Sequence, residues 1–517
     1  MSGVSGGVVL TTDFIAGQST EEVRERAQSR VERQNRSLYQ INTRVSLCDL
    51  FQKRGRAATL DDFPDSELDR LADRGFDWLW FLGMWQTGAA ARKISRQSPQ
   101  WLVEFRQVLP DLQPDDISGS CFAVTGYTAH SDFGGDAALD RLRHRIHQRG
   151  MRLVLDFVPN HTAPDHPWVK QHPEFYIAGT EEKLRSEPQN YVRLDGRVLA
   201  YGRDPYFPGW LDTLQLNYAQ PGLQEAMRRE LQSVAARCDG VRCDMAMLIL
   251  PDVFKRTWGL DIQPFWPLTL QSIHSKKPDF LFMAEVYWDL EWTLQQQGFD
   301  FTYDKRLYDR LLAQHARPVR EHFYADKDFQ EKSVRFLENH DEPRAASTFP
   351  PNIHRAAAVL TFLCPGLRFF HDGQFEGRTK KISPHLGRRP AEPVDSALSD
   401  FYSRLCNCVH LPETREGEWR LLEAKTAWDG NWTWDCFIIF AWQKPGNSPL
   451  LVVVNYAPNQ SQCSVRLPFE QIRGQKVRLR DLMGSAIYQR DGNDLLSHGL
   501  YLDLPAWGYH VFRVETV

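Results

Sequence analysis

Eight short apolar segments recur along the first 371 residues, and they limit the folds that this chain can adopt. Each is rich in β-forming residues, and helical patterns lie between them, for example at 66–74, 136–149, 223–237 and 354–363. Strands alternating with helices form parallel βαβ units, and eight such units close a (β/α)8 barrel. A doubly wound open sheet is the alternative, but no glycine-rich phosphate loop follows the first segment. We predict strands at 39–45, 78–84, 152–158, 240–246, 280–286, 299–304, 333–339 and 366–371.

The spacing of these strands predicts further parts of the molecule. More than 80 residues separate the third strand from the fourth, and a loop of that length is usually functional. After residue 417 the pattern changes to short strands at 436–442, 450–456, 464–467 and 509–514, with turns such as 429–431 and 491–493 between such runs. We therefore predict an N-terminal helical extension at 1–36, a catalytic barrel at 37–161 and 214–411, an excursion domain over its C-terminal face at 162–213, and a C-terminal antiparallel β-sandwich domain at 412–517.

Composition excludes several classes of partner. A formal net charge of -4 argues against a nucleic acid, which requires a basic face. Residues 1–16 have no Lys or Arg ahead of their short apolar run, and the sequence contains no apolar span of 18 residues. The nine cysteines have no regular spacing, which predicts free thiols in a reducing compartment. We expect a cytoplasmic protein with neither a nucleic-acid nor a membrane partner.

Charged residues stand inside or directly after several predicted strands. Arg242 and Asp244 are two residues apart on one strand, so they share a face, and burying them is costly unless they are paired. A structural ion pair would also explain them. The carboxyl ends of barrel strands meet at one mouth, where barrel enzymes place catalytic groups. The same mouth would receive Asp156, Asn160, His161, Glu285, His340 and Asp341. One such Asp alone is typical of a helix cap or turn, but the whole set predicts an active site.

Four segments, at 156–161, 240–244, 284–286 and 336–341, resemble the conserved segments of the α-amylase family of glycoside hydrolases. They occur in the family's order, and the resemblance covers most of residues 37–410. It implies that Asp244 is the nucleophile, Glu285 the general acid/base and Asp341 the carboxylate that grips sugar hydroxyls. It also implies that Arg242 keeps the nucleophile ionised, and that the residues contacting the sugar at the cleavage site are Asp156, His161 and His340.

The chemistry agrees with this assignment. Cleavage with retention requires a carboxylate that attacks the anomeric carbon and a carboxylic acid that protonates the leaving oxygen. Arg242 favours the charged form of its neighbour, while Glu285 needs a raised pKa to keep its proton. No cofactor is required. Asn160 is often near calcium in the family, but the remaining ligands of a calcium site cannot be read from the sequence.

Departures from the family pattern bear on the substrate. Starch-cutting α-amylases often carry a Lys-His pair after the nucleophile, where this chain has Met247 and Leu248. Residues 160–168 resemble the short-sugar members: α-glucosidases, trehalose synthases and sucrose-acting enzymes. Phe122 stands near the position of the tyrosine that stacks on the reacting sugar, and Trp288 is either a sugar platform or loop packing.

We therefore predict a retaining hydrolase of α-glucosidic bonds in short saccharides or glucosides. The same covalent intermediate could instead serve a transglycosylase, a phosphorylase or an isomerase. A non-catalytic sugar-binding relative is the alternative from another class, and the presence of all three carboxylates argues against it.

Overall fold

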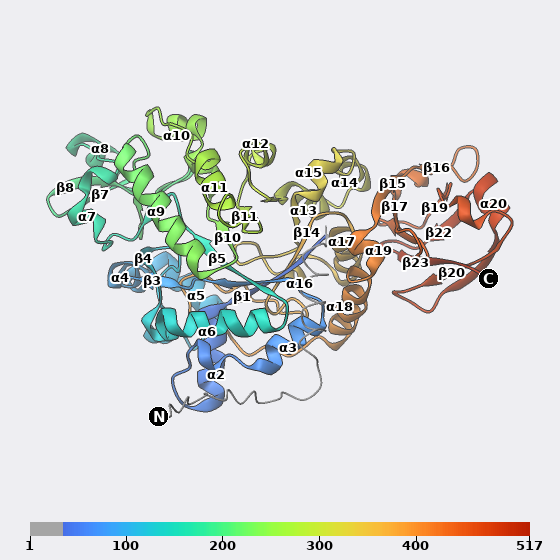
Figure 1. Cartoon of the computed structure of the whole chain (residues 1–517), viewed down its shortest axis with the longest axis horizontal. Helices are drawn as coiled ribbons and strands as arrows, with labels where there is room; N and C mark the ends of the chain where they lie inside the picture. The colour runs from blue at the N-terminus through green and yellow to red at the C-terminus, as the bar shows by residue number, and fades with distance from the viewer. Residues whose placement is uncertain (1–34) are drawn as a thin grey trace, which may run out of the picture.

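The computed structural model describes residues 35–517, and its centre is a closed barrel of eight parallel strands (Figure 1). This confirms the predicted fold class. The predicted extension at 1–36 lies outside the described residues, except for its last two. The barrel strands are β1 (Ser37–Asn42), β2 (Trp78–Leu82), β5 (Arg152–Phe157), β10 (Gly240–Cys243), β11 (Leu281–Ala284), β12 (Phe301–Tyr303), β13 (Ser333–Arg335) and β14 (Leu367–His371).

Most barrel strands end a few residues earlier than we predicted, and the reason is local. Residue Asn42 ends β1 because its side chain accepts a hydrogen bond from the backbone N–H of Val45 and so caps the next helix. Met245, just after β10, has a φ of 43°, which turns the chain out of the ladder. Asp244, Glu285, His340 and Asp341 therefore stand on loops just beyond the strand ends, whereas Asp156 and Arg242 lie on the strands themselves.

Helices separate the strands and surround the barrel. An amphipathic pattern places the apolar side of α6 against the barrel, with Ala138, Leu139, Leu142 and Ile146 buried. The larger helices are α2 (Thr43–Arg54), α3 (Asp65–Asp73), α4 (Ala89–Gln97), α5 (Pro99–Val108), α6 (Gly135–Gln148), α9 (Pro221–Arg237), α10 (Pro251–Trp258), α11 (Trp266–His274), α13 (Lys305–Leu312), α17 (Pro351–Leu363) and α18 (Ser396–Val409).

A small subdomain interrupts the barrel between β5 and α9, on the upper left of Figure 1. Its base is an antiparallel pair, β6 (His161–Thr162) with β9 (Leu214–Gln215). Beyond it, β7 (Tyr191–Leu194) and β8 (Arg197–Ala200) form a hairpin whose turn residues, Asp195 and Gly196, both have positive φ, as a two-residue hairpin turn favours. This is the excursion expected after the third barrel strand, and its outer limits stay a prediction.

The C-terminal domain contains a six-stranded sheet, in the order β15-β17-β18-β23-β20-β21, and a three-stranded sheet, β16-β19-β22. Strands β17 and β18 are apolar along nearly their whole length rather than alternating, because this part of the large sheet is covered on both faces. The strands are β15 (Glu418–Leu422), β16 (Ala424–Lys425), β17 (Phe437–Gln443), β18 (Leu450–Asn455), β19 (Ser461–Val465), β20 (Lys476–Asp481), β21 (Ile487–Asp491), β22 (Leu500–Leu504) and β23 (Tyr509–Thr516).

One predicted turn, 491–493, is wrong. Gly492 begins the short helix α20 (Gly492–Ser497), because the Asp491 carboxylate accepts hydrogen bonds from the backbone N–H groups of Asn493 and Asp494.

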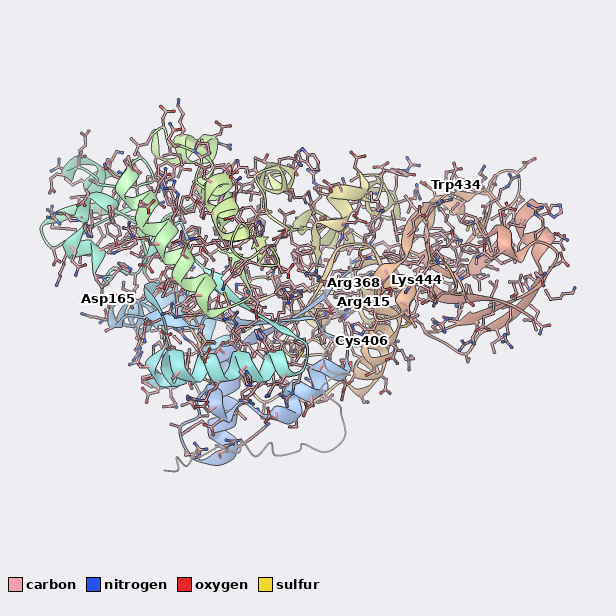
Figure 2. All side chains as sticks on the ribbon, in the orientation of Figure 1. Asp165, Arg368, Cys406, Arg415, Trp434 and Lys444 are labelled. Carbon is pink, nitrogen blue, oxygen red and sulfur yellow. The ribbon has the colours of Figure 1, made fainter. Side chains whose placement is uncertain are left out.

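Two buried arginines lie where the barrel meets the C-terminal part, and both are labelled in Figure 2. Arg415, on α19 (Pro412–Glu416), pairs with Asp77 at 2.5 Å. Arg368, on β14, donates to the backbone carbonyl of Thr414 at 2.9 Å. The nine cysteines are free thiols. Among residues 35–517, no helix is long and apolar enough to cross a membrane.

Candidate active site

A single guanidinium joins the carboxylates at the mouth of the barrel. Arg242, at the end of β10, is 1 % exposed. It donates from Nη1 to Asp244 Oδ1 and from Nη2 to Glu285 Oε2, both at 2.6 Å. Asp341 Oδ2 lies 3.8 Å from Nη2. A buried charge of this kind is tolerable because charge-assisted hydrogen bonds satisfy it. The inward charges that the sequence predicts are therefore brought together.

Aromatic rings enclose the same guanidinium. Its carbon lies 5.5 Å from the ring centre of Trp80, 5.2 Å from that of Phe122 and 5.9 Å from that of Tyr303. The rings hold Arg242 in one place between its carboxylates. Phe122 also lies 5.4 Å from the His340 ring, so it belongs to the mouth as the sequence predicts.

Glu285 is the carboxyl group best placed to hold a proton. Its Oε2 accepts from Arg242 and, at 2.7 Å, from the backbone N–H of Met245, while Oε1 accepts from the Tyr287 hydroxyl at 2.8 Å. Burial raises the pKa of Glu285 to about 7; Arg242 opposes that rise, and the charge of Asp244 adds to it. At neutral pH this group can both give and take a proton.

Asp341 has the opposite electrostatic character. Its Oδ2 is 3.0 Å from His340 Nε2, and its side chain is 38 % exposed at the mouth. Burial would raise the pKa of Asp341, but His340 and Arg242 together lower it. His340 is itself positioned by Gln40, whose Nε2 is 2.9 Å from its Nδ1. The surroundings thus favour the ionised form of Asp341 and the protonated form of Glu285.

The two remaining predicted residues come from the third barrel strand and the loop after it. Asp156 is buried, accepts from Trp80 Nε1 at 3.1 Å and from the backbone N–H of Gly83 at 2.7 Å, and burial raises its pKa to about 6. His161, on β6, is buried, which lowers its pKa, and its ring lies 5.2 Å from that of Trp210. His161 therefore connects the mouth with the excursion.

Comparison with known proteins identifies the catalytic part. The family model for the α-amylase catalytic domain matches residues 122–399, more than half of the chain. The chain belongs to the α-amylase family. Its solved structural relatives include the maltogenic α-amylase AmyB of Thermotoga neapolitana, with a TM-score of 0.67 and 18% identity over 94% of this chain and 99% of that one. An α-amylase of Lactobacillus plantarum has a TM-score of 0.63 and 20% identity over 95% and 100%. At these identities the likeness concerns the fold alone.

Curated relatives of the α-amylase family match a part of the chain. Alpha-amylase 3 of Dictyoglomus thermophilum is 24% identical over 53% of this chain and 57% of its own length. An alpha-1,4-glucan:maltose-1-phosphate maltosyltransferase of Burkholderia pseudomallei is 26% identical over 52% of this chain and 22% of its own length. The matched stretch is therefore little more than half of the first relative and under a quarter of the second.

Several contacts of this α-amylase-family site escape sequence reasoning. Tyr287 stands two residues after Glu285, a spacing that could have suggested it as a neighbour on the same side. Gln40 and Trp80 come from the first two barrel strands, and only the closure of the barrel brings them to His340 and Asp156. Nothing in the sequence around Gln40 or Trp80 predicts either contact.

The positions that depart from the family pattern have clear places in the structure. Met247 and Leu248 are 0 % and 2 % exposed, so neither side chain can contact an outgoing sugar. Trp288 has a φ of 65° and packs edge-on against Tyr206, with ring centres 5.0 Å apart.

A calcium site does not fit the surroundings of Asn160. Its Oδ1 accepts from Gln215 Nε2 at 2.9 Å, and its Nδ2 donates to Gln215 Oε1 at 3.2 Å, so the amide is engaged within the protein. Calcium prefers several carboxylate and carbonyl oxygens. Within residues 35–517, no group of three His, Cys, Asp or Glu side chains could hold a metal ion.

Proposed function

We propose that this chain is a retaining glycoside hydrolase that cleaves α-glucosidic bonds of short saccharides or glucosides through a covalent glycosyl-enzyme intermediate. The observation that carries the proposal is the pair of carboxyl groups on Arg242. Asp244 Oδ1 accepts one arm of the guanidinium at 2.6 Å, while buried Glu285 accepts the other and has a pKa of about 7. Cleavage of a glycosidic bond requires one carboxyl group that gives a proton and a second that acts as nucleophile or base, and retention is what the resemblance to the α-amylase family implies.

In the proposed first step, Asp244 attacks the anomeric carbon while Glu285 gives its proton to the leaving oxygen. Glu285 Oε2 is occupied by Arg242 and Met245, so Oε1, which also accepts from Tyr287, is the atom that faces the leaving group. In the second step, ionised Glu285 takes a proton from water while the water oxygen attacks the anomeric carbon, and the bond between that carbon and Asp244 breaks to release the sugar and the free carboxylate. Asp341, held anionic by His340 and Arg242, would accept hydrogen bonds from sugar hydroxyls.

Two features support a short substrate. The position of the outgoing-chain Lys-His pair is filled by the buried Met247 and Leu248, so this loop offers a long glucan no polar contact. A hollow of about 520 Å³ is lined by Tyr287, whose hydroxyl contacts Glu285, and by Trp288, Lys305 and neighbouring residues, and it would suit a small leaving group.

The first test is to follow anomeric protons by NMR while the protein acts on sucrose, maltose, trehalose, isomaltose and a glucosyl glycerol. Free α-glucose as the first product would support hydrolysis with retention and name the substrate. Phosphate and glycerol are then added as acceptors. A glucosyl phosphate or a new glucoside as the main product would favour the second candidate, a transferase or phosphorylase, which the maltosyltransferase relatives also suggest.

The roles of the two carboxyl groups are separated by changing the leaving group. We expect Asp244→Asn to lower turnover at least about a thousandfold on both a natural glucoside and α-glucosyl fluoride, because both need a nucleophile. Glu285→Gln should lose about 10²–10⁴-fold on the glucoside but far less on the fluoride, which leaves without protonation. Equal losses on both substrates in Glu285→Gln would show that Glu285 is not the general acid. Ordinary turnover in Asp244→Asn would show that Asp244 is not the nucleophile.

A further inference from the structure

Two arginines share a small hollow outside the carboxylate cluster. Arg44 is the second residue of α2, which follows β1 directly, and Arg92 lies on α4. Both line a hollow of about 210 Å³. A water molecule occupies ~30 Å³, so this volume could hold about seven waters or a small polar ligand.

Arg44 is buried without a carboxylate partner. Its side chain donates to the carbonyl of Gly119 at 2.5 Å, the hydroxyl of Thr87 at 2.9 Å and the carbonyl of Pro384 at 3.5 Å. All three acceptors are neutral. In the described part of the chain, no Asp or Glu pairs with Arg44, although the residue is only 9 % exposed. A buried charge that lacks a counter-charge is energetically costly.

Arg92 adds a second cation at the same place. Gly119 lies between the two arginines: its carbonyl accepts from Arg44, and its backbone packs closely against that of Arg92. A Cβ on Gly119, which has a φ of 83°, would lie only 2.8 Å from the backbone nitrogen of Arg92. Within residues 35–517, the Nε of Arg92 is buried with no hydrogen-bond partner, and its guanidinium forms no ion pair. Burial lowers the pKa of Arg44 and the nearby charge of Arg92 lowers it further, while Cys121 and Asp132 oppose this fall in pKa. The two guanidinium groups thus repel each other across shared space.

Among residues 35–517, none of the aspartates around the hollow forms an ion pair with Arg44 or Arg92, although the charge of Asp132 acts on Arg44 from a distance. Asp116 is held by both arms of Arg388, with Nε to Oδ1 at 2.6 Å and Nη2 to Oδ2 at 2.8 Å. The side chains of Asp115 and Asp132 are largely exposed, where solvent screens them. An anion that enters the hollow would therefore meet two cations that are not ion-paired with a carboxylate.

Arg368 is an internal comparison. It is fully buried and donates to the carbonyls of Asn35 and Thr414 at 3.0 Å and 2.9 Å, on the side of the barrel labelled in Figure 2. Carbonyl groups can therefore hold a buried arginine on their own. What distinguishes Arg44 is that it lines a hollow and has a second guanidinium beside it.

We propose that this hollow binds a phosphate group, either as the free ion or carried on a sugar. Two guanidinium groups can together donate hydrogen bonds to several phosphate oxygens at once. The hydroxyl groups of Thr87 and Ser118, which line the same hollow, add neutral donors. Gly119, which joins the two arginines, stands three residues before Phe122 of the active site. The site is separate from the carboxylates that Arg242 joins, so it does not depend on the proposed reaction.

Titration calorimetry of the full chain with inorganic phosphate, glucose 6-phosphate and chloride tests the proposal without turnover. We expect saturable binding of at least one phosphate compound, and Arg92→Gln should weaken it roughly ten- to a hundredfold by removing charge-assisted hydrogen bonds. Lys93→Gln is the matched control, because it removes one positive charge from an exposed position on the same helix and should change affinity less than about twofold. Arg44→Gln is a second variant. Its binding data are interpreted only if thermal unfolding shows that the variant protein is folded.

The comparison of ligands identifies the source of the phosphate. Tighter binding of glucose 6-phosphate than of inorganic phosphate indicates a phosphorylated sugar, and equal binding indicates the free ion. The proposal is overturned by equal affinity for chloride and phosphate, by unchanged binding in Arg92→Gln, or by the absence of heat with both phosphate compounds up to about 10 mM.

Discussion

At the scale of single residues, one hydroxyl group adjusts the proton affinity of the acid. The Tyr287 hydroxyl donates to Glu285 Oε1 at 2.8 Å and so stabilises the ionised carboxylate, which opposes the rise in pKa caused by burial. Cleavage needs protonated Glu285, so kcat/KM should fall as pH rises through about 7. In Tyr287→Phe the lost donor should raise the pKa of Glu285 and move this alkaline limb upward by about half to one pH unit.

The measurement is the pH profile of kcat/KM on the substrate found by NMR. Tyr308→Phe is the control, since its buried hydroxyl has no hydrogen-bond partner among the described residues and it lies on α13, away from Glu285. Its profile should match that of the unchanged protein. An alkaline limb in Tyr287→Phe that stays in place or moves to lower pH would contradict the role of this hydroxyl.

At the scale of elements, the loop after β10 explains why the site has no polar pair for an outgoing glucan chain. Met245, in the left-handed region, directs the chain into the short 3-10 turn Ala246–Ile249, whose four side chains are buried. We expect the double change M247K and L248H, which restores the starch-enzyme pair in sequence, to lower the free energy of unfolding by about 3 kcal/mol or more, because it buries polar groups without partners.

Urea denaturation measures this loss. Leu268→Lys provides a matched change at a residue of α11 that is 65 % exposed, and it should cost less than about 0.5 kcal/mol. A double variant as stable as the parent would mean that this loop can turn outward. It would also weaken the argument for a short substrate.

The same loop shows where sequence reasoning succeeds and where it stops. Barrel strands are buried runs of apolar, β-forming residues, so their number and order can be predicted directly from the sequence. Arg242, Asp244 and Glu285 can be predicted with them, because they stand at the carboxyl ends of these strands. A left-handed Met245 has no sequence signal, because methionine rarely adopts that conformation. The partners Gln40, Tyr287 and the Arg44–Arg92 pair depend on the closed barrel and its long loops, which local patterns do not encode.

At the scale of the whole molecule, the barrel and the C-terminal domain share one core. On β17, the side chains of Ile438, Phe440 and Trp442 join the core of the barrel, while Phe437, Ile439 and Ala441 join a second core behind the sheet. This alternation between two apolar faces explains why the strand reads as an uninterrupted apolar run. Helix α17, buried at ten positions, lies at the junction: Trp442 Nε1 donates to its last carbonyl, that of Leu363, at 2.7 Å.

Because the core is continuous, we expect the two parts to unfold together. Trp442→Ala should lower the free energy of unfolding by about 3–5 kcal/mol and destabilise the barrel as well as the C-terminal domain, since it removes a fully buried ring and its hydrogen bond at the junction. Calorimetry should then show a single transition that shifts as a whole. Trp432→Ala, at a residue of the same domain that is 66 % exposed, should change stability by less than about 0.5 kcal/mol. Two separate transitions, with only one of them moved by Trp442→Ala, would show that the barrel holds its fold without the sheet packed against α17.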